Sequence, residues 1–222
     1  MQPKRRKAVG PTASQKVYEA VRDAISSDQF KVGERLTEDA LARKFEVSRT
    51  PVREAMQRLA SDGFVVFTAH SGALIRGWSA EEVRDIFEIR ANLESMACRL
   101  AARRATRSDV ERLEALRLEW ESALIEDPRD VALISERNRA FHADIFSISG
   151  NYRLETMCLQ LMDLGFLSRS LSRFDRDDIN RSKQDHASLV QAIRAGDGDW
   201  AEAMMKSHIL AAASVFTGTE PS

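Results

Sequence analysis

The most informative segment of this chain is Val47-Ser48-Arg49-Thr50-Pro51-Val52-Arg53-Glu54-Ala55-Met56-Gln57-Arg58-Leu59. At helical period, Val52, Met56 and Leu59 form one narrow apolar stripe, and Arg49, Thr50, Arg53 and Gln57 fall on the opposite side. Ser48 is placed to cap the start, and Pro51 falls in the first turn, where its missing N–H costs little. We predict a short helix that is buried on one face and carries guanidinium groups on the other.

Such a face suits the DNA major groove, because an arginine can bond O6 and N7 of guanine together. The alternative is an ordinary amphipathic helix with a solvated, charged surface. The flanking sequence favours a DNA-recognition helix. We predict a helix over 14–27 and a second from Thr37 to about Lys44, which leads through a three-residue turn into the helix that starts after Ser48. Two β-prone runs follow, at 64–67 and 73–75. We therefore predict a winged helix-turn-helix domain over 14–76, preceded by a disordered basic arm over 1–13.

Charge and composition agree with two domains in a cytoplasmic protein. The net charge of −1 hides 14 Lys/Arg against 9 Asp/Glu in residues 1–76, and 19 against 25 in the remainder. A basic first third is typical of an anion-binding module. No apolar run reaches the roughly 18 residues of a membrane span, and the basic start lacks a following hydrophobic segment. Cys98 and Cys158 lie in helical apolar patterns, so we expect buried, reduced thiols.

Three segments of the first domain carry a family resemblance: Glu34-Arg35-Leu36-Thr37, Leu41-Ala42 and the run from Val47 to Ala55. They resemble the amino-terminal domain of GntR-family transcription regulators. The resemblance implies that Arg49, Thr50 and Arg53 contact operator bases and phosphates, with Ser48 at the helix start. Candidate DNA-binding residues also include Arg35, and His70 and Gly72 at the wing tip, although His70 is equally well placed to be merely exposed.

One position departs from the family pattern. Some members have a DNA-contacting arginine two residues after the position of Thr37, where this chain has Asp39. Asp39 cannot make that arginine contact with DNA. We therefore expect more of the base readout to rest on Arg49, Thr50 and Arg53 than in relatives with the extra arginine.

Beyond a linker over 77–80, the chain shows no strand signal. Ser79-Ala80-Glu81-Glu82 has the pattern of a capping box, and capping or turn residues such as Ser108-Asp109-Val110-Glu111 bound the later helices. We predict an antiparallel six-helix bundle over 81–217, so the fold class is mainly α. The expected helices cover 79–105, 108–126, 129–149, 151–172, 177–195 and 198–216.

Three of the four histidines lie in this predicted bundle. Asn138 precedes His142 by four residues and shares its helix face. His186 and His208 lie eleven residues before and after Asp197 in a predicted hairpin, so they should reach the same height. Each histidine alone is more often a packed or surface residue. Three imidazoles and an oxygen donor at one point would suit zinc or another borderline divalent ion.

The bundle also resembles the FCD ligand-binding domain of the FadR subfamily, in its six-helix VanR-type branch. The family's metal pattern, Asp-x-x-x-His followed by two histidines, maps onto Asn138, His142, His186 and His208. Asn138 replaces the commoner aspartate, which leaves a divalent site at +2 rather than +1. We expect weaker metal retention and stronger attraction for an anionic effector. The metal would be zinc, nickel or another transition metal; without one, the histidines would bind the effector directly.

A family arginine that can point into the same cavity matches Arg90, a candidate partner for an effector carboxylate. The alternative for Arg90 is a surface pair with Glu94, four residues later. Together these features predict a homodimeric regulator, in most such families a repressor, that binds a near-palindromic double-stranded DNA operator and responds to a small organic acid.

Two other functions remain open. A metal-dependent hydrolase fused to a DNA-binding domain would also use three histidines, but no glutamate stands in a recognisable motif beside one as a general base. A constitutive DNA-binding protein with a purely dimerising helical domain is the third possibility.

Overall fold

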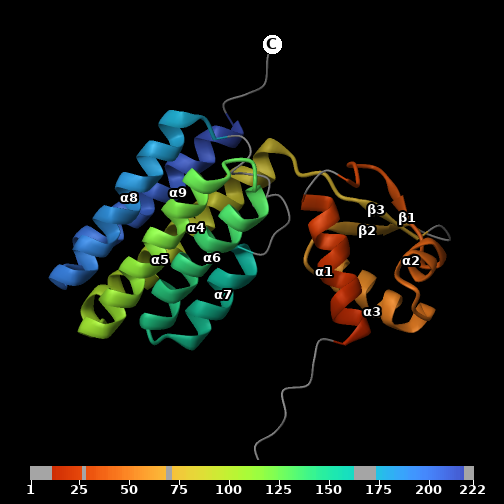
Figure 1. Ribbon diagram of the computed structural model, residues 1–222, viewed down its shortest axis with the longest axis horizontal. Coiled ribbons are helices and arrows are strands. Elements are labelled where there is room, and N and C mark those ends of the chain that lie inside the picture. Colours follow the sequence, from red (N-terminus) through yellow and green to blue (C-terminus); the bar gives the residue numbers. More distant parts are fainter. Residues whose placement is uncertain (1–11, 27–28, 69–71, 163–173, 218–222) are drawn as a thin grey trace, which may run out of the picture. The chain divides into compact units, whose positions relative to one another are not determined.

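The computed structural model describes residues 12–26, 29–68, 72–162 and 174–217, and it divides after Gly77 into two compact units. The first unit begins with α1 (Ala13–Ser26), α2 (Glu38–Phe45) and α3 (Arg49–Ser61) (Figure 1). Thr37 caps α2 by accepting a hydrogen bond from the backbone N–H of Ala40. The turn into α3 begins at Glu46, which is in the left-handed region at φ 54°.

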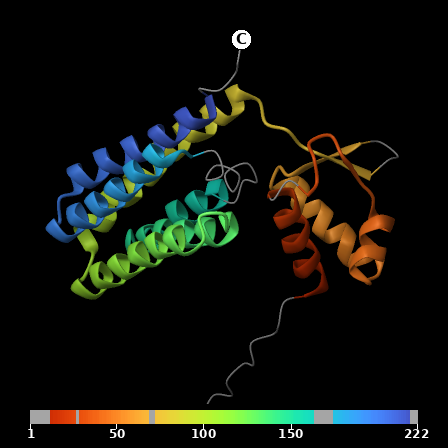
Figure 2. The ribbon, with the colours of Figure 1, turned by 45° about the horizontal axis from the view of Figure 1, so that its top comes forward.

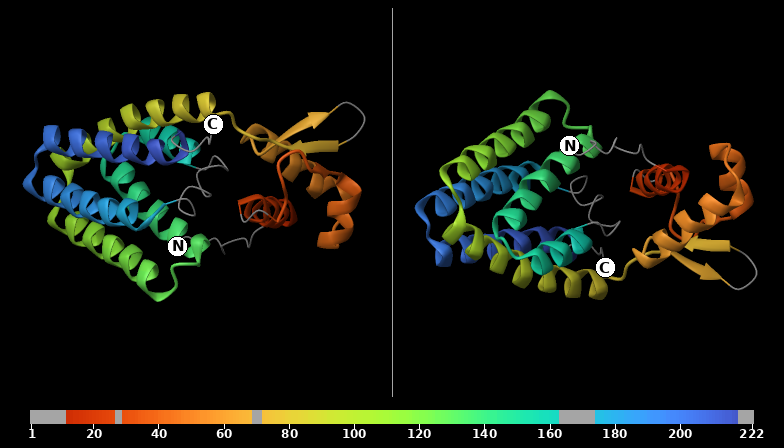
Figure 3. Two further views of the ribbon diagram at one scale, coloured as in Figure 1. Left: turned by 90° about the horizontal axis from the view of Figure 1, so that it is seen from above. Right: turned by 90° about the horizontal axis from the view of Figure 1, so that it is seen from below.

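A three-stranded sheet completes this unit. Strands β1 (Arg35–Leu36), β2 (Val65–Thr68) and β3 (Gly72–Ile75) have the order β1-β3-β2, and both pairings are antiparallel. Figure 3 shows β2 and β3 side by side as the predicted hairpin. The short strand β1 was not predicted, because two residues are too few to show a two-residue period.

The unit is held together by one apolar core. The stripe of α3 is fully buried, as predicted, together with Ala55 on the same face. It packs against the inner face of α1 and against β2. The core residues come from all three helices and the sheet: Val17, Tyr18, Val21, Ile25, Leu36, Leu41, Val52, Ala55, Met56, Leu59, Phe64, Val65, Ala73 and Ile75.

The second unit contains helices only in its described residues. They are α4 (Ala80–Arg104), α5 (Arg107–Glu126), α6 (Val131–Ile148), α7 (Tyr152–Met162), α8 (Arg176–Ala195) and α9 (Gly198–Thr217). The predicted fold, a winged helix-turn-helix followed by a helical bundle, is confirmed. Figure 2 shows α4, α8 and α9 along one side of the bundle and α5, α6 and α7 along the other. Helix α4 packs along α9 and also contacts α6, α7 and α8, so it lies at the centre of the bundle.

The helix ends follow local rules, with two departures. The predicted capping box of Ser79 and Glu82 opens α4, and Gly196 ends α8 in the left-handed region. The predicted start of the next helix at residue 108 is one residue late: α5 begins at Arg107, and Thr106 is its N-cap and forms a capping box with Asp109. Ser48 occupies the N-cap of α3 as predicted, but its side chain makes no capping hydrogen bond.

Three predictions lie wholly or partly outside the described residues. They are the arm over 1–13, of which only the last two residues are described, the wing residue His70, and the 163–172 portion of the fourth bundle helix. None of the described helices is both long enough and apolar enough to cross a membrane.

Candidate functional site

The second unit brings three histidines from three helices together. His142 comes from α6, His186 from α8 and His208 from α9. Their ring centroids are 4.9 to 5.4 Å apart, and one ligand nitrogen of each lies within 4.8 Å of the others. All three side chains are buried. The equal spacing of His186 and His208 from the α8–α9 turn therefore does place them side by side.

Two carboxylates orient two of the three imidazole rings in this histidine cluster, those of His142 and His208. Oε2 of Glu94, on α4, lies 3.2 Å from Nδ1 of His142, and Oδ2 of Asp185 lies 3.2 Å from Nδ1 of His208. A carboxylate on one ring nitrogen fixes the ring's orientation and favours the other nitrogen as a metal ligand. In both rings this leaves Nε2, and that atom of His142 is buried without a hydrogen-bond partner.

Neither carboxylate was predicted from the sequence. Glu94 had a readable signal, since it follows Phe87 and Ala91 and precedes Cys98 at helical spacing, within an apolar stripe. A glutamate in such a stripe is a buried charge that needs a partner. Asp185 had no such signal, because its neighbours at helical spacing include Arg181, Ser182 and Ser188 and form no apolar stripe.

His186 has the most unusual surroundings of the three. Its ring stacks on Phe141 at a centroid distance of 4.4 Å and lies equally close to Trp120. Both of its nitrogens are buried without a hydrogen-bond partner, and so is the indole N–H of Trp120. A buried polar atom without a partner is costly, and such atoms gather where a ligand is to be bound.

The protonation of the cluster follows from its burial. Burial lowers the pKa of His142 and holds the pKa of His186 well below the usual value. Burial by itself would raise the pKa of Glu94, but Arg90 and His142 outweigh it, so the pKa of this carboxyl is lowered. At neutral pH the cluster therefore holds neutral imidazoles at His142 and His186 beside an ionised Glu94.

The two other predicted site residues of this unit, Arg90 and Asn138, have different surroundings. Arg90 pairs with Glu94, with Nε 2.7 Å from Oε1, as in the alternative given for it, but the pair is buried and does not lie on the surface. Asn138 is half-buried on α6, one turn before His142. No hydrogen bond joins its side-chain amide to another described residue.

The polar face of α3 is exposed, as its periodicity indicates. Arg49, Thr50 and Arg53 are all exposed on this helix, and Ser48 is exposed at its N-cap. Two of these side chains contact α2. Arg49 Nε lies 2.6 Å from Oδ1 of Asp39, and Arg53 donates two hydrogen bonds to Glu38.

The sheet holds two further candidate DNA-binding residues. Arg35 is exposed on β1. Gly72 opens β3 at φ 87°, and a Cβ there would collide with the carbonyl oxygen of Leu36. The glycine is thus required by the close approach of β3 to the chain at the end of β1, whatever it contacts in DNA.

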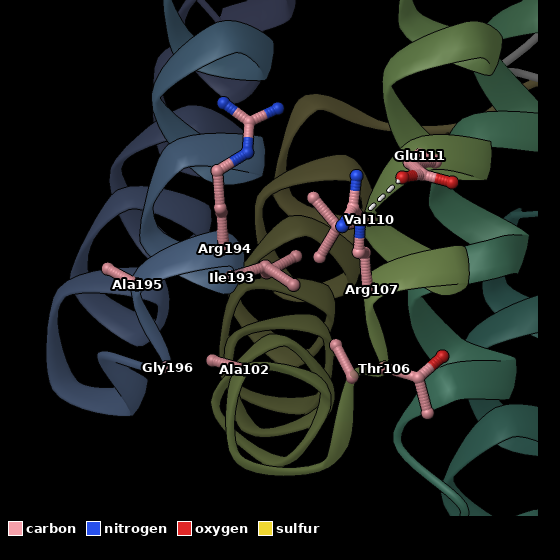
Figure 4. A pocket seen from close by; sticks show the side chains of 10 residues that line it. Ala102, Thr106, Arg107, Val110, Glu111, Ile193, Arg194, Ala195 and Gly196 are labelled. Atoms are coloured by element: carbon pink, nitrogen blue, oxygen red, sulfur yellow. Dashed lines mark hydrogen bonds and ion pairs between the residues drawn. The ribbon is translucent and has the colours of Figure 1, made fainter.

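A surface pocket of about 650 Å³ lies elsewhere in the second unit, between the ends of α4 and α8 and the start of α5. Figure 4 shows Arg107, paired with Glu111, and Arg194 at its rim. None of the predicted site residues lines it. It offers neither a cluster of metal ligands nor an unpartnered buried polar side chain, so we assign it no function.

Two families of known proteins match this chain. The family described as "Bacterial regulatory proteins, gntR family" matches residues 13–75, and the family described as "FCD domain" matches residues 85–211. The two matches fall on the two compact units. The FCD match alone covers more than half of the chain.

Similar proteins share the whole arrangement. The "Nta operon transcriptional regulator" of Aminobacter aminovorans is 30% identical, over 82% of this chain and 84% of the relative. The "Putative L-lactate dehydrogenase operon regulatory protein" of Escherichia coli is also 30% identical, over 88% and 83%. Among solved structures, Escherichia coli McbR/YncC has the same fold, with a TM-score of 0.79, 23% identity, and coverage of 93% of this chain and 98% of that one.

Proposed function

We propose that this chain, which belongs to the GntR family of bacterial transcription regulators and carries an FCD domain, binds its operator under the control of a divalent metal ion and a small carboxylate effector. Membership of this family makes the chain a DNA-binding regulator and not a hydrolase. The metal, the effector and the dimeric state are the proposed parts. The observation that carries the metal and the effector is the buried histidine cluster with unpartnered nitrogens, whereas the dimeric state is proposed from the family alone.

The cluster fits a divalent transition metal. Its nitrogens lie within 4.8 Å of one another, and ligands of one tetrahedral zinc are about 3.3 Å apart, so side-chain adjustment suffices. The low pKa values leave His142 and His186 with lone pairs at neutral pH. Glu94 and Asp185 supply the carboxylate–histidine contacts that metal sites use. We propose zinc first, with nickel as the alternative, and Asn138 as an oxygen ligand.

A small carboxylate is the effector that suits this site. Three imidazoles and an amide are neutral ligands, so a bound divalent ion keeps its full charge and attracts an anion. Arg90 is engaged by Glu94, which makes it a support for His142 rather than a free partner for the effector. We assign the second effector contact to the indole N–H of Trp120, which is buried against His186 and has no partner. The relative named for an L-lactate dehydrogenase operon makes hydroxycarboxylates the first class to test.

Regulation then requires coupling between the two units. In a homodimer on two half-sites of a near-palindromic operator, an effector that favours one pose of the DNA-binding units changes operator affinity. The coupling is reciprocal, so an effector that weakens DNA binding must itself bind less tightly to the DNA-bound protein. Release on effector binding is the behaviour of a repressor, which is the direction we propose.

Metal content is the first test. His142→Ala and His208→Ala should lose bound zinc or nickel, measured by elemental analysis after purification and by calorimetry on chelator-treated protein. His70→Ala is the matched control, because His70 is the one histidine of the chain outside the cluster. Wild-type protein that binds neither ion would refute the metal site.

Effector response is the second test. A duplex selected from a random pool by the wild-type protein serves as the operator, and L-lactate and related hydroxycarboxylates serve as probes. We expect one of them to bind the metal-loaded protein and to weaken operator binding, and Trp120→Phe to reduce its affinity. If no carboxylate binds the metal-loaded protein, the helical unit is a dimerisation domain and the proposed control fails. The molar mass of the protein in solution, measured by light scattering, tests the proposed homodimer.

A further inference from the structure

Two exposed arginines of α3 each contact an acidic residue in the first turn of α2. Arg53 forms a two-point pair with Glu38, in which Nε and Nη2 each donate at 2.8 Å. Arg49 has a different contact: its Nε lies 2.6 Å from Oδ1 of Asp39, and neither of its Nη atoms donates a hydrogen bond to a described residue. The capped start of α2 at Thr37 sets the position of both carboxylates.

We propose that Asp39 is a specificity-determining residue of the DNA-binding unit, which acts by positioning Arg49 toward a base edge and away from the phosphates. The inference rests on the proposed role of Arg49 as a base-reading residue. Asp39 itself is a positioning residue, since the structure places its carboxylate against the arginine.

The small free energy of an exposed ion pair indicates that this contact does not serve to stabilise the fold. The side chains of Arg49 and Asp39 are 67% and 51% exposed. A pair at such positions contributes about 0–1 kcal/mol to the free energy of unfolding. A carboxylate on a surface meant for DNA also repels phosphates, so on affinity alone Asp39 is unfavourable. Asp39 therefore adds little to the stability of the fold and weakens the general affinity for DNA. Its presence is explained if it increases the discrimination between specific and nonspecific DNA sequences.

The geometry gives a way to discriminate. A long arginine side chain on an exposed helix samples many rotamers and pairs readily with the phosphate backbone, which carries no sequence information. Holding its Nε side against Asp39 restricts those rotamers and leaves the Nη1 and Nη2 end for O6 and N7 of guanine. It also makes a phosphate contact less favourable, because the charge of the arginine is already partly compensated.

The contrast with Glu38 supports the assignment. The two-point pair engages both Nε and Nη2 of Arg53, which leaves that arginine fewer free donors. Hydrogen bonding by Arg53 also lowers the pKa of Glu38, so this pair remains charged over the whole physiological range. Arg53 is thereby suited to a single phosphate contact, whereas Arg49 keeps a two-donor end.

The test compares the duplex selected by the wild-type protein with a scrambled duplex of the same composition, over a series of salt concentrations. For Asp39→Asn we expect tighter binding to the scrambled duplex, a steeper salt dependence by about one charge, and a ratio of specific to nonspecific affinity that is about 5- to 10-fold lower. Asp23→Asn is the matched control. It removes one carboxylate from another exposed ion pair of the same unit, with Arg22 on α1, and should leave the ratio unchanged.

A double-mutant cycle separates this inference from the proposed role of Arg49. In an Arg49→Ala background, Asp39→Asn should have no effect on the affinity ratio. If it lowers the ratio equally in both backgrounds, Asp39 acts without Arg49 and the inference is wrong. If Arg49→Ala lowers the ratio and Asp39→Asn does not, the inference fails while Arg49 stays a base reader. If Arg49→Ala leaves the ratio unchanged, Arg49 does not read a base, and the inference about Asp39 is wrong together with that role.

Discussion

Glu94 joins Arg90 to His142 in the interior of the helical unit. One oxygen of its carboxylate is 2.7 Å from Nε of Arg90, and the other is 3.2 Å from Nδ1 of His142. A fully buried carboxylate is tolerable only with such partners, because leaving water costs an ion several kcal/mol. The chain of contacts therefore ties the position of a proposed metal ligand to an ion pair in the centre of the bundle.

Removing the charge of Glu94 should destabilise the helical unit. Glu94→Gln leaves Arg90 buried without a counter-charge, so the free energy of unfolding should fall by about 3–5 kcal/mol. Urea denaturation of the metal-free protein measures it. Glu88→Gln changes an exposed glutamate on the same helix and should stay within about 0.5 kcal/mol of wild type. A similarly small effect at Glu94 would mean that its ion pair is worth no more than a surface pair.

Asp185 offers a milder change that tests the orientation of His208. Asp185→Asn removes the carboxylate from Nδ1 of that ring while leaving the imidazole in place. Affinity for zinc should fall by about 10- to 100-fold, measured by competition with a chelating dye. Asp177→Asn, at an exposed position on the same helix, is the control. Equal affinity for the two variants would remove Asp185 from the support of the site.

Arg49 should carry a large share of sequence-specific binding. Arg49→Ala should weaken binding to the selected duplex by about 1–3 kcal/mol, since a bidentate contact with guanine would be lost. Lys16→Ala removes the same charge from an exposed position on α1 and controls for simple electrostatics. Fluorescence anisotropy measures both. A loss at Arg49 no greater than that at Lys16 would assign the arginine to general charge attraction.

Gly72 should be required for the pairing of β1 with β3. Gly72→Ala combines a left-handed φ with a collision against the carbonyl of Leu36, so hydrogen exchange at the β3 amides should accelerate. Gly33 has a similar φ of +81° but no atom within 4 Å of an added Cβ. Gly33→Ala therefore reports the left-handed strain alone, about 1–2 kcal/mol. Identical protection in the two variants would show that the collision is relieved at no cost.

The metal-free protein should lose stability as the pH falls from 7.5 to 5. Burial lowers the folded-state pKa of His142 and His186, while in the unfolded chain each titrates near 6.5. Below about pH 6.5 the unfolded state therefore binds more protons than the folded state, and the free energy of unfolding decreases. Each unit of pKa difference is worth about 1.4 kcal/mol.

Urea denaturation at pH 7.5, 6.5 and 5.5 measures this dependence. His186→Phe keeps an aromatic ring between Phe141 and Trp120 and removes the titrating group, so its profile should be flatter. A wild-type profile that is flat from pH 7.5 to 5.5 would contradict the buried, neutral state of these histidines.

Much of the fold could be predicted from local patterns. The apolar stripe of α3 and the capping box at Ser79 each depend on residues within one or two turns, and each formed as expected. The errors were also local. Thr106 competes with Ser108 for the start of α5, and β1 is only two residues long.

Less of the candidate sites than of the fold could be predicted from the sequence. The spacing of His186 and His208 from a hairpin turn is a property of the sequence, and it was enough to place two histidines side by side. The partners that set the chemistry of the site come from other helices: Glu94 beside His142, Trp120 beside His186, and Asp39 beside Arg49. Helical period tells which face of a helix is buried. It does not tell which side chain of another helix lies opposite, because that depends on how the helices pack.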